Sequence, residues 1–399
     1  MGTQFAGRLN AVSPSVTLAM NARAGELRAR GIDVFNFGVG EPDFAPPAHV
    51  LEAARAAVAL PETSKYGPVS GILSLRQAIA TSVSQKRGVP TDVKQVVVSA
   101  GAKHALYNLS VALFEAGNEV IVIAPYWVSY TEQIKMAGAT PVVVRTAEKN
   151  GWRVDPADLE RAITPATKAI LLNAPSNPSG VVYSNAELER ILEVAARKDL
   201  WVISDEIYGD LVYDGRPFTS AYAVGTRLGA KMILVDGVSK AYAMTGWRIG
   251  WTVCDPALAK ACDMVQGQST SNVAIASQFA ALAALTGPQN EIASMRAAFE
   301  KRRGVMVAGL NTVSGLRCST PDGAFYTFVN CEGLYGRPFR NKTIETDDDA
   351  ALFLLEEAHV VTVPGGPFGV PGYLRFSYAT SEERIRTGIE MLHAVLGKR

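Results

Sequence analysis

Seven short apolar runs between residues 93 and 290 constrain the fold of this chain more than any other feature. Amphipathic stretches with helical spacing separate several of them, for example Leu106–Phe114 and Leu188–Ala196. Such alternation of strands and helices is typical of an α/β fold with a mostly parallel sheet. We expect strands buried on both faces at Val96–Ser99, Val120–Ala124, Pro141–Val144, Ala169–Asn173, Trp201–Ser204, Met232–Val235 and Ile249–Val253.

The rest of the chain has a different pattern. Residues 255–313 are rich in alanine and have helical spacing, and after them short strands alternate with two further helices. The pattern predicts a smaller α+β lobe, with strands near Phe325–Val329, Val360–Val363 and Leu374–Ser377 and helices near Asp348–Ala358 and Glu382–Leu396. We therefore expect a large domain of residues 48–290 and a small domain made of residues 1–47 and 291–399.

Composition excludes several classes of protein. The chain has 39 Lys and Arg against 38 Asp and Glu, a balance that argues against a dedicated nucleic-acid-binding protein. The apolar runs fall short of the ~18 residues that a membrane span requires. The first ten residues lack a signal-peptide pattern, so a cytoplasmic location is expected. The four cysteines form no CxxC pair, and no metal-binding motif is visible.

Candidate functional residues follow the apolar runs, because parallel sheets bind ligands beyond the carboxyl ends of their strands. Lys240 comes just after one run, where desolvation would make its amine nucleophilic. Arg248, eight residues later, has a planar fork suited to a phosphate. The alternative is a surface Lys and Arg in a glycine-rich turn. Asp205 ends another run, although an Asp-Glu pair is more often a solvated turn or a helix cap.

Two more segments lie just past strands. Asn177 stands between two prolines, in a segment that could equally be a simple turn. Residues 99–104 lead from a strand into a helix, and their small residues allow backbone amides to approach an anion. This segment lacks the GxxxxGK[ST] pattern, so a nucleotide-binding P-loop is not supported. His104 is expected to pack or to face solvent rather than to catalyse.

Together these signals describe one ligand. It has a phosphate, a ring cation that requires a carboxylate, and an aldehyde that requires an amine. Pyridoxal 5′-phosphate has all three groups, and proteins hold it with a Schiff-base lysine and an aspartate at the ring nitrogen.

The chain resembles the class I/II aminotransferases of fold type I, and most closely the bacterial gamma-subgroup aspartate and aspartate/prephenate aminotransferases. The resemblance extends over residues 12–396. It rests on motifs that occur in the family's order: GVGEPDF (38–44), KYGPVSG (65–71), PYWVSY (125–130), NAPSNPSG (173–180), SDEIY (204–208), SKAYAMTGWRIG (239–250) and RFSYATS (375–381). It implies a large domain with a mostly parallel central sheet between helices, plus a smaller α+β domain.

The resemblance also implies the catalytic roles. Lys240 would form the Schiff base and move the proton between the substrate Cα and the cofactor C4′ in a ping-pong aldimine/ketimine mechanism. Asp205 would keep the pyridine nitrogen protonated. Asn177 and Tyr208 would hydrogen-bond the 3′-oxygen of the cofactor, and Trp127 would stack on its ring.

The remaining implied contacts concern the phosphate and the substrate. Tyr66 would reach the phosphate from the neighbouring subunit, which implies a homodimer with shared sites. The phosphate contacts within one chain would come from Gly101, Ala102, Lys103, Ser239 and Arg248. Arg375 would clamp the substrate α-carboxylate, and the other substrate contacts would come from Gly40, Trp127, Asn177, Lys103, Ser15 and Thr17.

Two positions depart from the family pattern. Many relatives have a serine three residues before the lysine, where this chain has Gly237. Relatives commonly read NPTG, where this chain has Ser179 in place of the threonine. The first change could remove one phosphate contact, and the second keeps the hydroxyl.

The expected activity is amino-group transfer between aspartate, or another acidic amino acid, and 2-oxoglutarate. Lys103 is the candidate for attracting the distal carboxylate of such a substrate, although it could serve only the phosphate or the structure. A prephenate or aromatic aminotransferase is the main alternative. A C–S lyase that uses the same cofactor is a more remote one. The effector domain of a transcription regulator is the non-enzyme alternative, and the early start of the motifs speaks against it.

Overall fold

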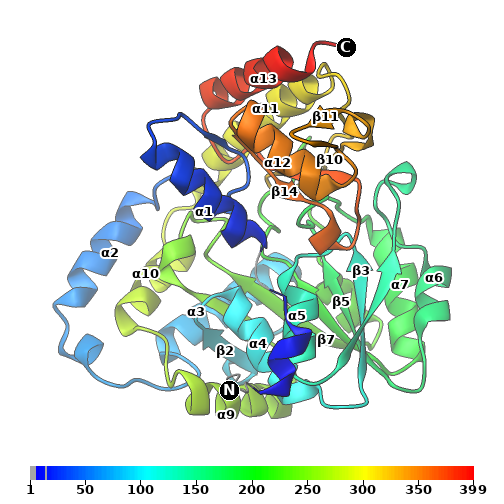
Figure 1. Cartoon of the computed structure of the whole chain (residues 1–399). Coiled ribbons are helices and arrows are strands. Elements are labelled where there is room, and N and C mark those ends of the chain that lie inside the picture. Colours follow the sequence, from blue (N-terminus) through cyan, green and yellow to red (C-terminus); the bar gives the residue numbers. More distant parts are fainter. Residues whose placement is uncertain (1–5, 14–15) are drawn as a thin grey trace, which may run out of the picture.

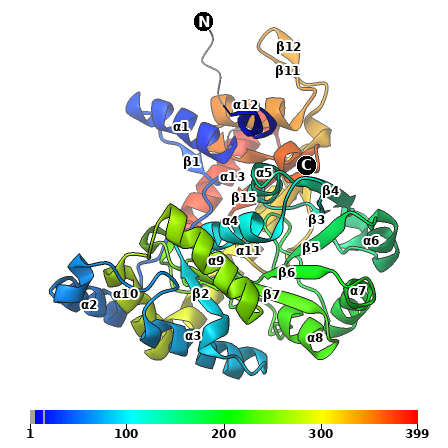
Figure 2. The ribbon, with the colours of Figure 1, turned by 90° about the horizontal axis from the view of Figure 1, so that it is seen from below.

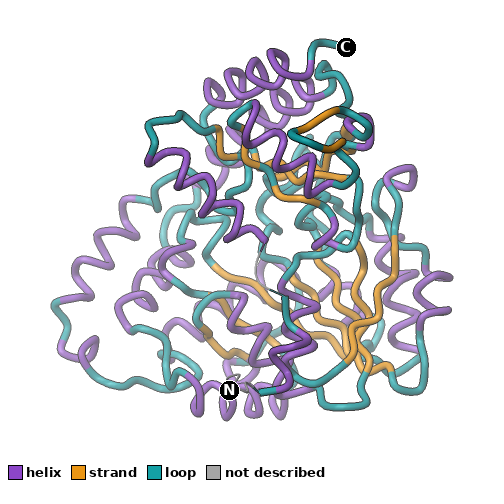
Figure 3. The backbone as a smooth tube through the Cα atoms, in the orientation of Figure 1, coloured by secondary structure: helices purple, strands orange, loops and turns teal. Residues whose placement is uncertain are grey.

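The computed structural model describes residues 6–13 and 16–399, and its centre is a seven-stranded sheet (Figures 1 and 3). Strand β8 is antiparallel to both of its neighbours, and the other adjacent strands pair in parallel. In spatial order the strands are β2 (Val96–Ser99), β8 (Gly250–Val253), β7 (Lys231–Gly237), β6 (Trp201–Asp205), β5 (Thr167–Asn173), β3 (Glu119–Ala124) and β4 (Thr140–Arg145). The predicted α/β fold is confirmed.

Helices cover both faces of this sheet, as the view from below in Figure 2 shows. Along β5, Ile170 and Leu172 belong to one apolar cluster while Ala169 and Leu171 belong to another, because successive side chains of a strand point to opposite faces. The first cluster includes residues of α2 (Ala48–Val58), α3 (Leu73–Arg87), α6 (Pro156–Ala162), α7 (Asn185–Arg197), α8 (Ala221–Arg227) and α10 (Ile275–Thr286). The second includes residues of α4 (Ala102–Leu113), α5 (Ser129–Met136) and α9 (Pro256–Ser269).

One predicted strand differs from its expectation. Residues Pro141–Val144 lie in β4, but this strand is at the edge of the sheet and has β3 as its single neighbour. Val144 is buried, whereas Val143 is 38% exposed. The prediction of burial on both faces is therefore wrong here, because an edge strand is covered on fewer sides than its apolar sequence indicates.

A second body of structure lies above the sheet in Figure 1 and contains the carboxyl-terminal part of the chain. Its antiparallel sheet has the order β14 (Val363–Pro364), β15 (Tyr373–Ser377), β10 (Tyr326–Asn330) and β9 (Arg317–Cys318). The pair β1 (Phe35–Asn36) and β13 (Val360–Val361) is parallel, and β11 (Pro338–Phe339) and β12 (Lys342–Thr343) form a hairpin. Its helices are α1 (Val16–Ala29), α11 (Asn290–Leu310), α12 (Asp347–Glu357) and α13 (Glu382–Leu396).

The predicted strand at residues 360–363 is divided in the structure. Its first half, β13, pairs with β1, and its second half, β14, pairs with β15. The split brings the amino-terminal segment next to the carboxyl-terminal sheet. Phe35 and Phe37 accordingly belong to the same apolar cluster as residues of α11 and α13, and so does Tyr208 from the segment after β6. The division at residues 48 and 290 stays a prediction.

Local sequence explains where the main helices begin and end. Ser184 and Glu187 form a capping box at the start of α7, in which each side chain accepts a hydrogen bond from the other residue's backbone N–H. Helix α3 ends at Arg87 and is capped by Gly88, which adopts a left-handed conformation with φ of 67°. No helix among the described residues is long and apolar enough to cross a membrane.

Candidate active site

A cavity of about 530 Å³ lies where the carboxyl ends of β5, β6 and β7 face the second body of structure. The register of these three strands explains why polar residues meet at the cavity, because Asn173 pairs with Asp205, and Asp205 pairs with Val235. The cavity brings together most of the residues predicted from the sequence, namely Gly40, Ala102, Lys103, Trp127, Asn177, Asp205, Tyr208, Ser239, Lys240, Arg248 and Arg375. Among the described residues, no group of three candidate ligands could hold a metal ion.

Asp205 is the acidic group of the cavity. It is 3% exposed, and its Oδ2 accepts a hydrogen bond of 2.6 Å from the Tyr130 hydroxyl. Its Oδ1 accepts from the Ile207 backbone N–H at 3.2 Å. Burial raises the pKa of Asp205 to about 6, against the opposing effect of these hydrogen bonds. The carboxylate is therefore ionised at neutral pH and able to hold a cationic N–H.

Lys240 is the amine of the cavity. Its Nζ donates a hydrogen bond of 2.6 Å to the Gly40 carbonyl and lies 5.7 Å from the ring centres of Tyr208 and Phe325. The pKa of Lys240 is lowered to about 8, chiefly by burial; Glu41 and Asp205 oppose this shift, whereas the nearby cations Arg375 and Arg248 contribute to it. A sizeable fraction of the amine is neutral near pH 8, as a nucleophile or base requires.

An anion-binding cradle adjoins the lysine. Helix α4 begins at Ala102, and within the described residues no acceptor is found for the backbone N–H groups of Ala102 and Lys103. The side chain of Arg248 lies beside this helix start, where it donates to the carbonyls of Ala100 and Thr245. Free amides at a helix N-terminus together with a guanidinium favour a phosphate or a similar anion.

Two glycines keep this cradle compact. Gly101 has φ of 85°, and a Cβ atom there would lie 2.6 Å from Nη2 of Arg248. A Cβ atom on Gly250 would lie 2.2 Å from the backbone N of Ala102. Side chains at either position would fill the space next to the free amides.

Arg375 is the buried cation on the side of β15. It is 3% exposed, and its two Nη atoms donate to Asn177 Oδ1 at 3.0 Å and to the Gly38 carbonyl at 2.7 Å. Its Nε has no hydrogen-bond partner within the described chain. Burial lowers the pKa of Arg375. A buried guanidinium with an unused donor is suited to a planar carboxylate.

Lys103 and Trp127 line another part of the cavity wall. The Lys103 Nζ lies 4.9 Å from the centre of the Trp127 ring. Burial, and then the charge of Arg248, lowers the pKa of Lys103. Lys103 thus offers a second cation to a ligand that also reaches Arg375.

Two of the predicted residues, Gly101 and Tyr66, are not among those that line the cavity. Tyr66 is 92% exposed and lies outside the cavity of its own chain. Ser15 falls outside the described residues, and Thr17 lies in α1, at a position whose side chain the structure does not describe. Their proposed roles stay predictions. His104 accepts a hydrogen bond from the Ala100 backbone N–H at 3.2 Å, which is a packing role.

Sequence reasoning missed four residues of the site. Tyr130 holds Asp205, and Tyr326 shares a hydrogen bond of 2.9 Å with the Tyr208 hydroxyl. Glu41 and Thr245 are joined by a hydrogen bond of 2.9 Å at the cavity wall. Three of the four stand inside the motifs at 38–44, 125–130 and 239–250, which was an available signal. No motif pointed to Tyr326, because its strand β10 comes from a distant part of the chain.

The structure also accounts for glycine at position 237. A Cβ atom there would lie 2.8 Å from the Ile249 carbonyl and 3.0 Å from the Cα of Gly250. A serine would require this pair of strands to move apart. In this chain, the close approach of β7 and β8 therefore disfavours any side chain at position 237.

Fold and site together define an α/β protein whose sheet presents an amine, a carboxylate and an anion cradle to one small-molecule cavity. Comparison with known proteins narrows this class. Residues 32–392 match the family described as aminotransferase class I and II. The chain belongs to this family and is an aminotransferase.

Individual relatives cover almost the whole chain. The aspartate aminotransferase of Streptomyces avermitilis is 43% identical over 99% of this chain and 97% of its own length. The aspartate/prephenate aminotransferase of Cereibacter sphaeroides is 42% identical over 96% of each chain. The crystal structure of the aspartate aminotransferase from Rhizobium meliloti superposes with a TM-score of 0.94, at 40% identity and 98% coverage of both chains.

Proposed function

We propose that this aminotransferase uses pyridoxal 5′-phosphate to transfer the amino group between aspartate and 2-oxoglutarate, as a cytoplasmic homodimer. The observation that carries the choice of substrate is a pair of cations that line one cavity, the buried Arg375 and the more exposed Lys103. A substrate with two carboxylates satisfies both cations. The names of the relatives from Streptomyces and Cereibacter support the same class of substrate.

The residues of the cavity fit this cofactor. Asp205 is suited to its ring nitrogen, Lys240 to its aldehyde, and the free amides of Ala102 and Lys103 with Arg248 to its phosphate. When bound, the cofactor supplies the aldehyde and an electron-withdrawing ring that weakens the Cα–H bond of the amino acid. The donor set thus matches the three polar groups of the cofactor one by one.

The protein supplies position and proton transfer. The ionised Asp205 holds a proton on the ring nitrogen, and Tyr130 keeps its carboxylate in place. Lys240, whose pKa is lowered to about 8 chiefly by burial, takes and returns the proton at the substrate Cα. Arg375 orients the α-carboxylate, and Lys103 attracts the distal carboxylate. Tyr66, exposed on its own chain, would complete the phosphate site of a partner subunit.

Purified enzyme with aspartate and 2-oxoglutarate tests this proposal. Oxaloacetate and glutamate are the expected products, and kcat/KM for aspartate should exceed the values for alanine and phenylalanine. A Lys240→Ala variant should lose both the transfer and the visible absorbance of the bound cofactor. If kcat/KM for prephenate exceeded that for aspartate, prephenate rather than aspartate would be the preferred substrate. Pyruvate and ammonia from a cysteine conjugate, without transfer, would contradict the proposal.

A further inference from the structure

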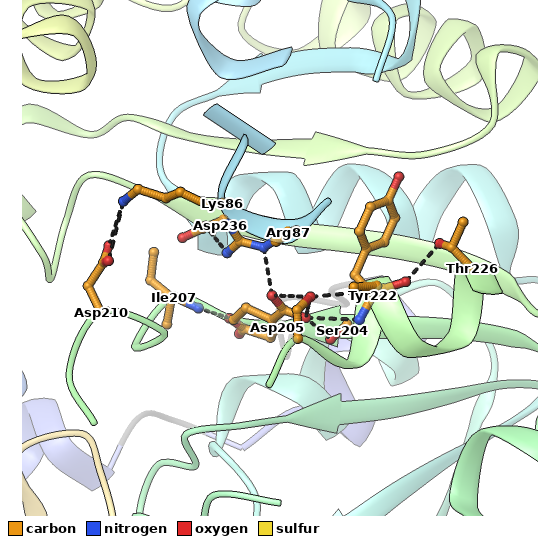
Figure 4. Close-up of polar contacts among 12 residues, drawn as sticks. Lys86, Arg87, Ser204, Asp205, Ile207, Asp210, Tyr222, Thr226 and Asp236 are labelled. Carbon is orange, nitrogen blue, oxygen red and sulfur yellow. Dashed lines mark hydrogen bonds and ion pairs between the residues drawn. The ribbon is translucent and has the colours of Figure 1, made fainter. Parts of the chain in front are cut away.

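A cluster of buried charges lies behind the active site, on the side of the sheet covered by α3 and α8 (Figure 4). Arg87, the last residue of α3, donates from Nε to Glu206 Oε2 at 2.8 Å and from Nη2 to Asp236 Oδ2 at 2.6 Å. The three side chains are 7%, 1% and 16% exposed. None of them lines the cavity, so the proposed reaction does not use them directly.

Each carboxylate of this cluster is attached to a strand that carries a residue of the site. Glu206 follows Asp205 directly at the end of β6, and its backbone N–H donates to the Val235 carbonyl at 2.9 Å. Asp236 is in β7, four residues before Lys240, and accepts from the Gly237 N–H at 2.7 Å. Arg87 therefore joins the two strand ends that present the acid and the amine.

Glu206 is held by more than the guanidinium. It accepts hydrogen bonds from the hydroxyls of Ser204 and Ser220 and from the Tyr222 backbone N–H, at 2.8 to 3.0 Å. So many donors fix the carboxylate in one position. Because Asp205 is the preceding residue and lines the cavity, its direction depends on the peptide that Glu206 anchors.

The cluster also sets the charge behind the site. Two carboxylates face one guanidinium, and burial raises the pKa of Asp236 to about 7. Glu206 acts on Asp205 in the same sense, as a like charge that raises its pKa. The other ionisable groups near the cluster are Asp210, which pairs with Lys86 at 3.3 Å, and Tyr222 and Tyr242. Those facing Asp205 are Tyr130, Tyr208 and Lys240.

We propose that Arg87 is a positioning residue of the active site. By pairing with Glu206 and Asp236 at once, it fixes the ends of β6 and β7 and balances the negative charge behind Asp205. The role rests on the proposed function, because it concerns how Asp205 holds the ring nitrogen of the cofactor. Without Arg87, the like charge of Glu206 would act on Asp205 without a balancing cation, and the proton shared with the ring nitrogen would move toward the Asp205 carboxylate.

Arg87→Met in the holoenzyme tests the charge. We expect kcat to fall about tenfold, as is typical when a supporting group of a site is lost. We also expect the ¹⁵N resonance of a labelled cofactor ring to move toward its unprotonated position. Arg87→Met combined with Glu206→Gln restores the net charge, and should return the ¹⁵N resonance toward that of the wild type. Lys86→Met removes the neighbouring exposed cation and should change neither quantity.

Arg87→Lys tests whether the two-pronged contact with both carboxylates is needed, and it remains a test of the proposal if Arg87→Met does not fold. A lysine keeps the charge but lacks the fork that reaches both carboxylates. Ring protonation should persist while kcat falls. Wild-type kcat and ¹⁵N resonance in Arg87→Lys, with only a lower melting temperature, would overturn the proposal. A wild-type enzyme that binds no cofactor would instead contradict the proposed function.

Discussion

Asp205 is buried and Lys240 partly buried in the cavity wall, and the loss of water around them moves their pKa values toward each other, to about 6 and about 8. Both groups are costly for the folded protein in their charged forms, because few polar partners replace the lost water. A pair of groups with shifted pKa values in one cleft is typical of active sites. The cost in stability follows from the same shifts that make the two groups reactive.

Asp205→Asn should show this cost in the cofactor-free enzyme. The folded-state pKa of Asp205 lies above its ordinary value of 3.8, so the folded state binds the proton more tightly than the unfolded state. Stability should therefore fall as the pH rises from about 4 to about 6, and stay lower above that range. The substitution should stabilise the enzyme by about 1–3 kcal/mol at pH 8 and have little effect at pH 4. Urea denaturation at both values measures this, and a destabilised variant at pH 8 would contradict it.

Replacing Lys103 with glutamine should separate acidic from apolar substrates. The loss of one cation should raise KM for aspartate by about tenfold or more, since a charge-assisted contact disappears. KM for alanine should change little, because alanine has no distal carboxylate. Steady-state kinetics with both amino acids measure the ratio. An equal increase for both would mean that Lys103 serves the phosphate or the structure.

The positions of the site residues depend on how the helices and strands pack against one another. The amino end of α4, the turn at Arg248 and the start of β8 meet closely: the Arg248 guanidinium donates to the Ala100 carbonyl, and a Cβ on Gly250 would lie 2.2 Å from the Ala102 nitrogen. The sequence signalled this through the small residues at 99–102 and the motif at 239–250. The edge position of β4 and the division of residues 360–363 were not predictable, since both depend on which strand lies alongside.

Two glycines of one motif offer a matched test at this scale. Gly250→Ala would place a Cβ 2.2 Å from the Ala102 nitrogen, whereas Gly246→Ala would meet nothing within 4 Å. The first should raise the dissociation constant of the cofactor at least about tenfold and destabilise the enzyme by about 1–3 kcal/mol. The second should bind the cofactor like the wild type. Fluorescence titration of the cofactor-free enzyme measures both, and equal affinities would contradict the proposed cradle.

Over the whole molecule, the site lies between two bodies of structure with separate apolar cores. Arg375 comes from β15 of the second body, yet it bonds Asn177 of the first and Gly38 of the amino-terminal segment. Tyr66, by contrast, is 92% exposed and does not line the cavity of its own chain. One chain thus leaves one proposed phosphate contact for a second copy to supply.

Tyr66→Phe should test the shared site. If the hydroxyl reaches the phosphate of the partner subunit, the variant should bind the cofactor about tenfold more weakly, as expected for one charge-assisted hydrogen bond. Sedimentation should still give the mass of two chains for both proteins. If the variant is a stable dimer with unchanged cofactor affinity, Tyr66 does not contact the phosphate. If the wild type is a monomer, the proposed homodimer is wrong.

The sequence by itself determined the α/β class, most strands of the large sheet, and the set of residues that meet at its carboxyl end. It could do so because strand periodicity and short motifs are local properties of the chain. Tertiary structure alone decided that Tyr326 bonds Tyr208, that Tyr130 holds Asp205, and that Arg87 joins two carboxylates behind the site. These contacts join residues 75 to 149 positions apart, and the pKa values of Asp205 and Lys240 depend on the burial and charges that such packing creates.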